Sequence, residues 1–239
     1  MTVFYLPKQF QTHMDYAVPL GLAFALSAAH FLSEKYAGRL EKWHSQILGL
    51  SAGLFLAVLT IDLLPRVLVS KESYYFLFAG LVAYHGLEKY VYQHSLPKDI
   101  QQNVGLAHVA GFFFDNFFDG IVIVLVFATA ETAALLVFVP LLLHKLSSSL
   151  LLSHLTETVH HVKQHRFLLS TSTFLGALTA WQLQIHAAPQ QYSSVFSFLL
   201  GTLLYLVVRD MIPGGKRGDL GFFIAGAAIG LAAMAFTGG

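Results

Sequence analysis

Residues 104–130 read VGLAHVAGFFFDNFFDGIVIVLVFATA, an apolar run that carries two carboxylates, Asp115 and Asp119, near its middle. A membrane-spanning α-helix needs about 20 mostly apolar residues, because the hydrocarbon core is about 30 Å thick. Backbone polar groups in lipid must be satisfied within a helix or a closed barrel, and this run is too long and continuous for a barrel strand. The stretch therefore predicts a spanning helix with acidic side chains at membrane depth.

Seven further apolar runs occupy most of the remaining chain. Of the 239 residues, 56% are hydrophobic and 11% are charged, whereas soluble domains carry roughly 25% charged residues. The connections between the runs are short, so we predict an all-α integral membrane protein with eight spanning helices in a single transmembrane domain, residues 1–239. Besides 104–130, the predicted spans are 16–33, 46–69, 73–93, 132–157, 167–186, 193–212 and 219–237.

Charge and cysteine content bear on partners and orientation. The net charge of +1 gives no reason to expect a nucleic acid, and the lack of cysteine excludes disulfides and thiolate metal sites. Cytoplasmic connections of membrane proteins carry an excess of Lys and Arg. With the spans numbered in chain order, ten Lys and Arg residues follow spans 1, 3, 5 and 7, and three lie on the opposite side of the membrane. Both termini are therefore predicted to lie outside the cytoplasm. The ten are Lys35, Arg39, Lys42, Lys89, Lys98, Lys163, Arg166, Arg209, Lys216 and Arg217, and the three are Lys8, Arg66 and Lys71.

Two of the predicted spans share a spacing of glycine, aspartate and proline. Gly53, Asp62 and Pro65 lie in the second span, and Gly201, Asp210 and Pro213 repeat their offsets in the seventh. Under the predicted orientation these spans run in opposite directions, which is typical of the inverted repeats of secondary transporters. We predict a repeat of spans 1–3 and 6–8 around spans 4 and 5, with Asp62 and Asp210 near the transport path. The alternative is that each Asp-x-x-Pro only ends a helix at an interface.

The polar residues of the fourth and fifth spans form a candidate metal site. Asp115 and Asp119 are one turn apart and project to the same face, as His144 and Ser148 do in 132–157. If these spans pack as an antiparallel pair, Asp115, Asn116, Asp119 and His144 can converge. Their oxygen and nitrogen ligands suit a divalent cation such as zinc, iron(II) or manganese(II). Alternatively, Lys145 neutralises an aspartate in a buried ion pair and no metal is needed.

These motifs resemble those of the ZIP (Zrt/Irt-like) family of divalent metal transporters over nearly the whole chain. Asp115-Asn-Phe-Phe-Asp119-Gly is similar to the His-Asn-x-x-Asp-Gly pattern of the family's fourth helix, without its first histidine. Asp62-Leu-Leu-Pro65, Gly80 to Lys89 and Tyr205 to Pro213 look like parts of its second, third and seventh helices. The resemblance implies an eight-helix fold, both termini extracytoplasmic, and a binuclear metal site between helices 4 and 5.

The fifth span departs from the family's His-Glu-x-Pro-His-Glu pattern. His144 is kept, but Lys145 stands where an acidic ligand is expected and Ser148 where the next ligand is expected. The resemblance then implies a degraded, mononuclear site of Asp115, Asp119 and His144 with Ser148 as a weak fourth ligand. The second position would keep Asn116 and Asp119, with the Lys145 ammonium in place of the second cation.

The sequence therefore predicts a ZIP-like transporter that moves a divalent metal cation by alternating access in a bacterial inner membrane. The alternative is a non-transporting accessory or structural subunit of a larger membrane complex, binding no metal. Such a subunit could bind pigment or haem through intramembrane histidines, of which the candidates are His30, His85, His108 and His154. Lipid and a divalent cation are the expected partners, together with a homodimer mate or a larger complex. No enzymatic activity is expected, because the Ser147–Ser149 cluster is better explained by helix contacts.

Overall fold

In a computed structural model of the chain, every regular element in the described residues is a helix, which confirms the all-α prediction. The described residues are 16–68, 70–93, 101–129, 131–158, 160–186, 189–211 and 219–237. Within them, eight long helices correspond to the eight predicted spans. They are α1 (Ala17–Lys35), α3 (His44–Val58), α5 (Lys71–Gln93), α6 (Gln101–Thr129), α7 (Glu131–Thr158), α8 (His160–His186), α9 (Pro189–Leu206) and α10 (Leu220–Thr237).

Short helical segments extend or connect three of these helices. Two of them, α2 (Ala37–Leu40) and η2 (Glu41–Trp43), connect α1 to α3. Helix α3 is continued by η3 (Leu59–Leu63) and α4 (Leu64–Val67), and α9 is continued by η4 (Val207–Met211). The largest boundary error lies in α8, which begins at His160 whereas hydropathy placed its start at residue 167. Residues 160–166 are mostly polar but contain neither glycine nor proline, so nothing in the backbone ends the helix there.

Two helical segments, Gly38–Val67 and Val109–Ala128, are long and apolar enough to cross a membrane. Four shorter apolar stretches lie in the other described helices: Ala17–Ser33, Ala134–Leu150, Ser193–Arg209 and Leu220–Phe236. Length and composition thus support two crossings within the described ranges, and the arrangement with eight spans stays a prediction.

Three pairs of helices approach each other so closely that glycine is required on both sides. A Cβ on Gly120 of α6 would overlap the carbonyl oxygen of Thr173 in α8, and one on Gly176 of α8 would overlap that of Phe117 in α6. The same reciprocal contact joins α5 to α9 and α3 to α10. The glycines of these two pairs are Gly80 with Gly201 and Gly53 with Gly226. Backbone meets backbone at each pair, so the two helices of a pair are closely matched in shape.

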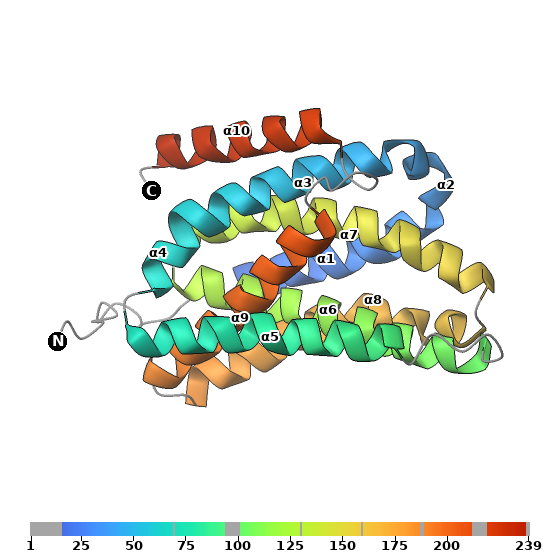
Figure 1. Ribbon diagram of the computed structural model, residues 1–239, viewed down its shortest axis with the longest axis horizontal. Helices are drawn as coiled ribbons and strands as arrows, with labels where there is room; N and C mark the ends of the chain where they lie inside the picture. Colours follow the sequence, from blue (N-terminus) through green and yellow to red (C-terminus); the bar gives the residue numbers. More distant parts are fainter. Residues whose placement is uncertain are drawn as a thin grey trace.

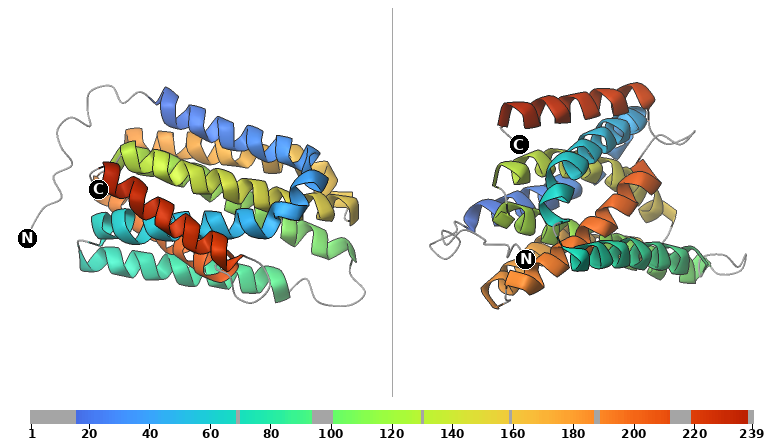
Figure 2. Two further views of the ribbon diagram at one scale, coloured as in Figure 1. Left: turned by 90° about the horizontal axis from the view of Figure 1, so that it is seen from above. Right: turned by 60° about the vertical axis from the view of Figure 1, so that its left-hand side comes forward.

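Two of these pairs, α3–α10 and α5–α9, lie beside a group formed by the other four long helices. In Figure 1, α3 and α10 lie in the upper part of the view and α5 in the lower part, while α9 runs obliquely up from the level of α5 toward α3. In the view from above in Figure 2, α3, α10 and α5 all lie on the same side of α1 and α8. Within the group, α1 packs against α7 and α8, and α6 packs against α7 and α8, while α3 packs against α7 from outside the group. The helices therefore form a group of α1, α6, α7 and α8, with the pairs α3–α10 and α5–α9 beside it.

The second and seventh predicted spans share an unusual local structure at the repeated motif. Both helices widen into a π-helix, η3 over Leu59–Leu63 and η4 over Val207–Met211, beginning six residues after Gly53 and Gly201 respectively. In η3 the N–H of Leu64 bonds to the carbonyl of Leu59, as a π-turn requires. The two helices run in opposite senses across the molecule (Figure 1). The spacing repeated in the sequence is therefore also a repeat of backbone conformation.

Replacing Gly80 by alanine is expected to lower the free energy of unfolding by about 1–3 kcal/mol, because the added methyl overpacks against the α9 backbone at Phe198. Gly86 lies on the same helix, and a methyl group added there would have no neighbour within 4 Å, so Gly86→Ala is the matched control. It should leave stability unchanged or raise it by up to about 1 kcal/mol through helix propensity. Denaturant unfolding in detergent measures both, and equal effects of the two substitutions would contradict the close helix contact.

Candidate metal centre

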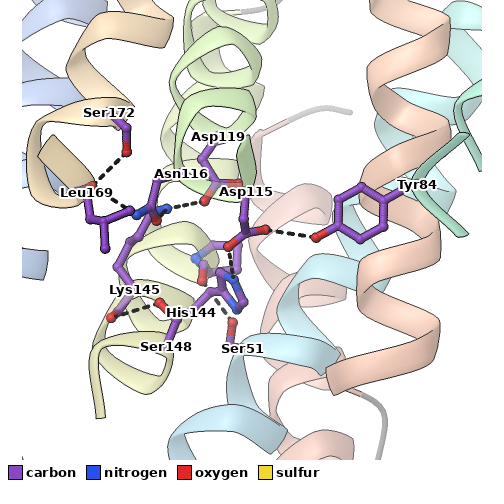
Figure 3. Close-up of polar contacts among 11 residues, drawn as sticks. Ser51, Tyr84, Asp115, Asn116, Asp119, His144, Lys145, Ser148, Leu169 and Ser172 are labelled. Carbon is purple, nitrogen blue, oxygen red and sulfur yellow. Dashed lines mark hydrogen bonds and ion pairs between the residues drawn. The ribbon is translucent and has the colours of Figure 1, made fainter. Parts of the chain in front are cut away.

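The carboxylates of α6 and the imidazole of α7 come together inside the molecule (Figure 3). Asp115 and Asp119 lie one turn apart on α6, and their side chains are 12% and 1% exposed. One ligand atom each from Asp115, Asp119 and His144 lies within 4.8 Å of the others. Carboxylate oxygen and imidazole nitrogen are ligands of zinc and of other divalent transition metals. This three-residue cluster is the one group of its kind among the described side chains.

Asp115 has a different partner at each carboxylate oxygen. Its Oδ2 atom lies 3.5 Å from Nε2 of His144, and its Oδ1 atom accepts a hydrogen bond of 3.3 Å from the hydroxyl of Tyr84 in α5. The other ring nitrogen of His144, Nδ1, is buried and has no hydrogen-bond partner in the described part of the chain. One turn before His144, the carbonyl of Pro140 accepts a hydrogen bond of 2.8 Å from Ser51 of α3. Helices α3 and α5 therefore both reach this side of the cluster.

Lys145 holds the other side of the cluster. Its side chain is fully buried, and Nζ lies 2.5 Å from Oδ2 of Asp119. The same ammonium donates a hydrogen bond to Oδ1 of Asn116. The amide nitrogen of Asn116 donates to the carbonyl of Leu169 in α8 at 3.0 Å, and Ser172 donates to that carbonyl at 2.6 Å. Lys145 is thereby connected through polar contacts to both α6 and α8.

This arrangement bears on the alternatives that the sequence left open. The ion pair between Lys145 and Asp119 is present, as the no-metal alternative requires, but Lys145 does not lie between the two carboxylates. Asp115 is instead next to His144. The cluster thus holds two carboxylates and one ammonium, so it carries one net negative charge when both carboxylates are ionised and His144 is neutral.

Two residues predicted as ligands have other roles in this structure. The side-chain oxygen of Asn116 is engaged by Lys145, and the hydroxyl of Ser148 donates to the backbone carbonyl of Lys145 at 3.3 Å. The side chains of Asn116 and Ser148 are thus engaged by other groups, and their assignment as metal ligands stays a prediction. The Lys145 ammonium lies against Asn116 and Asp119, where the resemblance implies it in place of a second cation.

The other residues predicted to lie near the transport path or to bind pigment or haem either have partners outside this cluster or have side chains that the structure does not describe. Asp62 is paired with Arg66 at 2.6 Å, so its charge is balanced within its own helix. Asp210 lies in the π-helix η4, and its side chain is outside the described residues, as are those of His108 and His154. Of the remaining candidate histidines, His30 is buried and Nδ1 of His85 lies 2.8 Å from the hydroxyl of Tyr205.

Three groups at the site could not be anticipated from the residue pattern: Tyr84, the carbonyl of Leu169 and Ser51. Tyr84 lies in the segment that resembles the family's third helix, but its position in the sequence does not indicate a contact with α6. Backbone carbonyls carry no signal in the sequence at all. Tyr84 is partly buried, as are three leucines of the same helix, Leu77, Leu81 and Leu87. Only the packing shows that the Tyr84 hydroxyl meets Asp115.

The donor set fits one divalent cation. Asp115, Asp119 and His144 offer two oxygens and one nitrogen in a buried position, and the buried Nδ1 atom of His144 is a further polar atom without a hydrogen bond in the described structure. A three-residue site with an open position is the usual arrangement where a metal must also exchange ligands. In comparisons with known proteins, the sequence matches no family model and no curated protein.

The Lys145 ion pair can be tested by a double-mutant cycle. Lys145→Met leaves Asp119 buried without its partner and is expected to lower the free energy of unfolding by about 3–5 kcal/mol. Adding Asp119→Asn removes the orphaned charge and should recover most of that loss. Unfolding is followed in detergent with a chelator present, so that a bound cation does not replace the ammonium. Purely additive effects of the two substitutions would rule out a direct ion pair.

Proposed function

We propose that this chain is a ZIP-like membrane transporter that carries one divalent cation at a time through a site of Asp115, Asp119 and His144. The observation that carries the proposal is the convergence of their ligand atoms within 4.8 Å inside the molecule. Ionisable residues at membrane depth are costly, and they usually mark ion or proton pathways. The ion is the substrate of the protein rather than a resident cofactor, and zinc, iron(II) and manganese(II) all suit the donor set.

Lys145 fills the role of a second cation in this proposal. Its ammonium lies against Asp119 and Asn116, where the resemblance to the ZIP family leads one to expect a second metal. A fixed positive charge there neutralises Asp119 and leaves the charge of Asp115 for the transported ion. The proposed site is therefore mononuclear.

The packing suggests how access to the site alternates. The cluster lies on α6 and α7. From outside the group, Tyr84 of α5 contacts Asp115 directly, and Ser51 of α3 contacts the backbone of α7 one turn before His144. The paired glycines hold α5 to α9 and α3 to α10, so each pair can move as a unit. In our proposal the group α1, α6, α7 and α8 rocks against these two pairs, and the repeated π-helical segments give the two end states similar energies.

The proposed protein lies in a bacterial inner membrane as a multi-pass protein with eight spans and with both termini outside the cytoplasm. Two segments long enough to cross, four shorter apolar stretches and the asymmetry of Lys and Arg support this arrangement. Aromatic side chains are exposed on α5 and α10, among them Tyr75, Phe78, Phe222 and Phe236. In the proposed arrangement these aromatic rings face lipid and its interface rather than water.

Asp119→Ala is expected to reduce metal uptake at least tenfold, because it removes one of three ligands and leaves Lys145 unpaired. Uptake of radiolabelled zinc, iron and manganese into proteoliposomes measures the effect. Glu72→Ala, which removes an exposed carboxylate from α5, is the matched control and should transport as well as the parent. Asp119→Asn, which keeps the size of the side chain, separates loss of the ligand from loss of folding. Undiminished uptake by both Asp119 variants would refute the transport mechanism.

A second candidate function is favoured by one observation. The ion pair of Lys145 and Asp119 satisfies one carboxylate without any metal, as expected of an accessory or structural subunit that no longer transports. Such a protein would purify with a larger membrane complex and contain no stoichiometric zinc, iron or manganese by elemental analysis. The pigment- or haem-binding form of this hypothesis predicts a coloured protein, so an absorption spectrum tests it directly.

A further inference from the structure

Tyr84 reaches the cluster from the side opposite to Lys145 (Figure 3). It lies on α5, which packs tightly against α9 and only slightly against α6. Its hydroxyl donates to Oδ1 of Asp115 at 3.3 Å, while Oδ2 of the same carboxylate faces Nε2 of His144 at 3.5 Å. The two oxygens of Asp115 are therefore not equivalent, because one is engaged by Tyr84 and the other is directed toward the remaining ligand atoms.

We propose that Tyr84 is a positioning residue for the divalent cation: its hydrogen bond holds Oδ1 of Asp115 so that Oδ2 alone is presented to the ion. The inference rests on the proposed function of the site. Metal-ligating carboxylates are themselves hydrogen-bonded, and loss of such an outer partner typically lowers metal affinity by about 10- to 100-fold. With Oδ1 engaged, Asp115 contributes a single oxygen, which suits a compact site shared with Asp119 and His144.

The position of Tyr84 is fixed by contacts within its own helix pair. Its ring lies against the ring of Tyr205 in α9, with centroids 5.7 Å apart, and the Tyr205 hydroxyl lies 2.8 Å from Nδ1 of His85 in α5. Tyr84 therefore moves with the α5–α9 pair, whereas Asp115 moves with α6. At 3.3 Å the hydrogen bond is already longer than the usual 2.5–3.0 Å for O–H···O, so a small displacement breaks it. Tyr84 thus couples the geometry of the metal ligand to the relative position of the two groups of helices.

Tyr84→Phe tests this inference, since it removes the hydroxyl and retains the ring that packs on Tyr205. Zinc binding to the purified full chain is measured by titration calorimetry, and the dissociation constant is expected to rise by about 10- to 100-fold. The visible spectrum of the cobalt(II)-loaded protein should also change, because Asp115 becomes free to bind through both oxygens. Tyr75→Phe removes an exposed hydroxyl from the same helix and should change neither measurement. Thermal unfolding of the metal-free variants should match that of the parent.

The outcomes separate this inference from the proposed function. Zinc binding by the Asp115→Ala variant measures the background contributed by histidines elsewhere in the chain. If Asp115→Ala abolishes the tight zinc site but Tyr84→Phe binds with the parent's affinity and cobalt spectrum, the role of Tyr84 is wrong and the site stands. An equal loss in Tyr84→Phe and Tyr75→Phe also overturns the role. If Asp115→Ala binds zinc as well as the parent, or the parent binds none, the metal site itself is wrong and the inference falls with it.

Discussion

The fully buried ammonium of Lys145 is the constraint on which the arrangement of the central helices depends. A buried charge without partners is very costly, and Lys145 is satisfied by Asp119 and Asn116 together. Asn116 in turn donates to the backbone of α8 at Leu169. One positive charge thereby sets the register of α7 against α6 and, through Asn116, of α6 against α8. A shift of α7 along α6 would break the contacts of the ammonium with Asp119 and Asn116, and a shift of α8 would leave the amide of Asn116 without its acceptor.

The same constraint orients the metal ligands. Consecutive residues of an α-helix point about 100° apart, so directing Lys145 toward Asp119 and Asn116 directs His144 to a different side. There it meets Asp115, which is also in contact with Tyr84 of α5. The site consequently has two sides, one closed by a fixed charge and one next to the flanking helix pairs. In the proposed mechanism the Lys145 side stays closed, and the ion reaches and leaves its ligands at the interface between the two groups of helices, first from one membrane face and then to the other.

Much of the fold could be predicted from the sequence, because hydropathy and helical spacing determine where helices lie. Apolar runs predict the all-α class, each long helix and most helix boundaries. They do not predict the start of α8, because polar residues extend that helix at its N-terminus. At the site, the i, i+4 spacing predicted that Asp115 and Asp119 share a face, and the structure brings His144 to them. The contact of Tyr84 with Asp115 could not be predicted, because it depends on which side of α5 meets α6.

The close backbone contacts at the paired glycines have a consequence for how such a fold tolerates change. Gly120 with Gly176, Gly80 with Gly201, and Gly53 with Gly226 fix three helix crossings by direct contact between backbones. Substitutions at other positions can therefore accumulate while the crossings persist. In such a protein, the spacing of a few small residues would still indicate common ancestry after overall sequence identity has decayed.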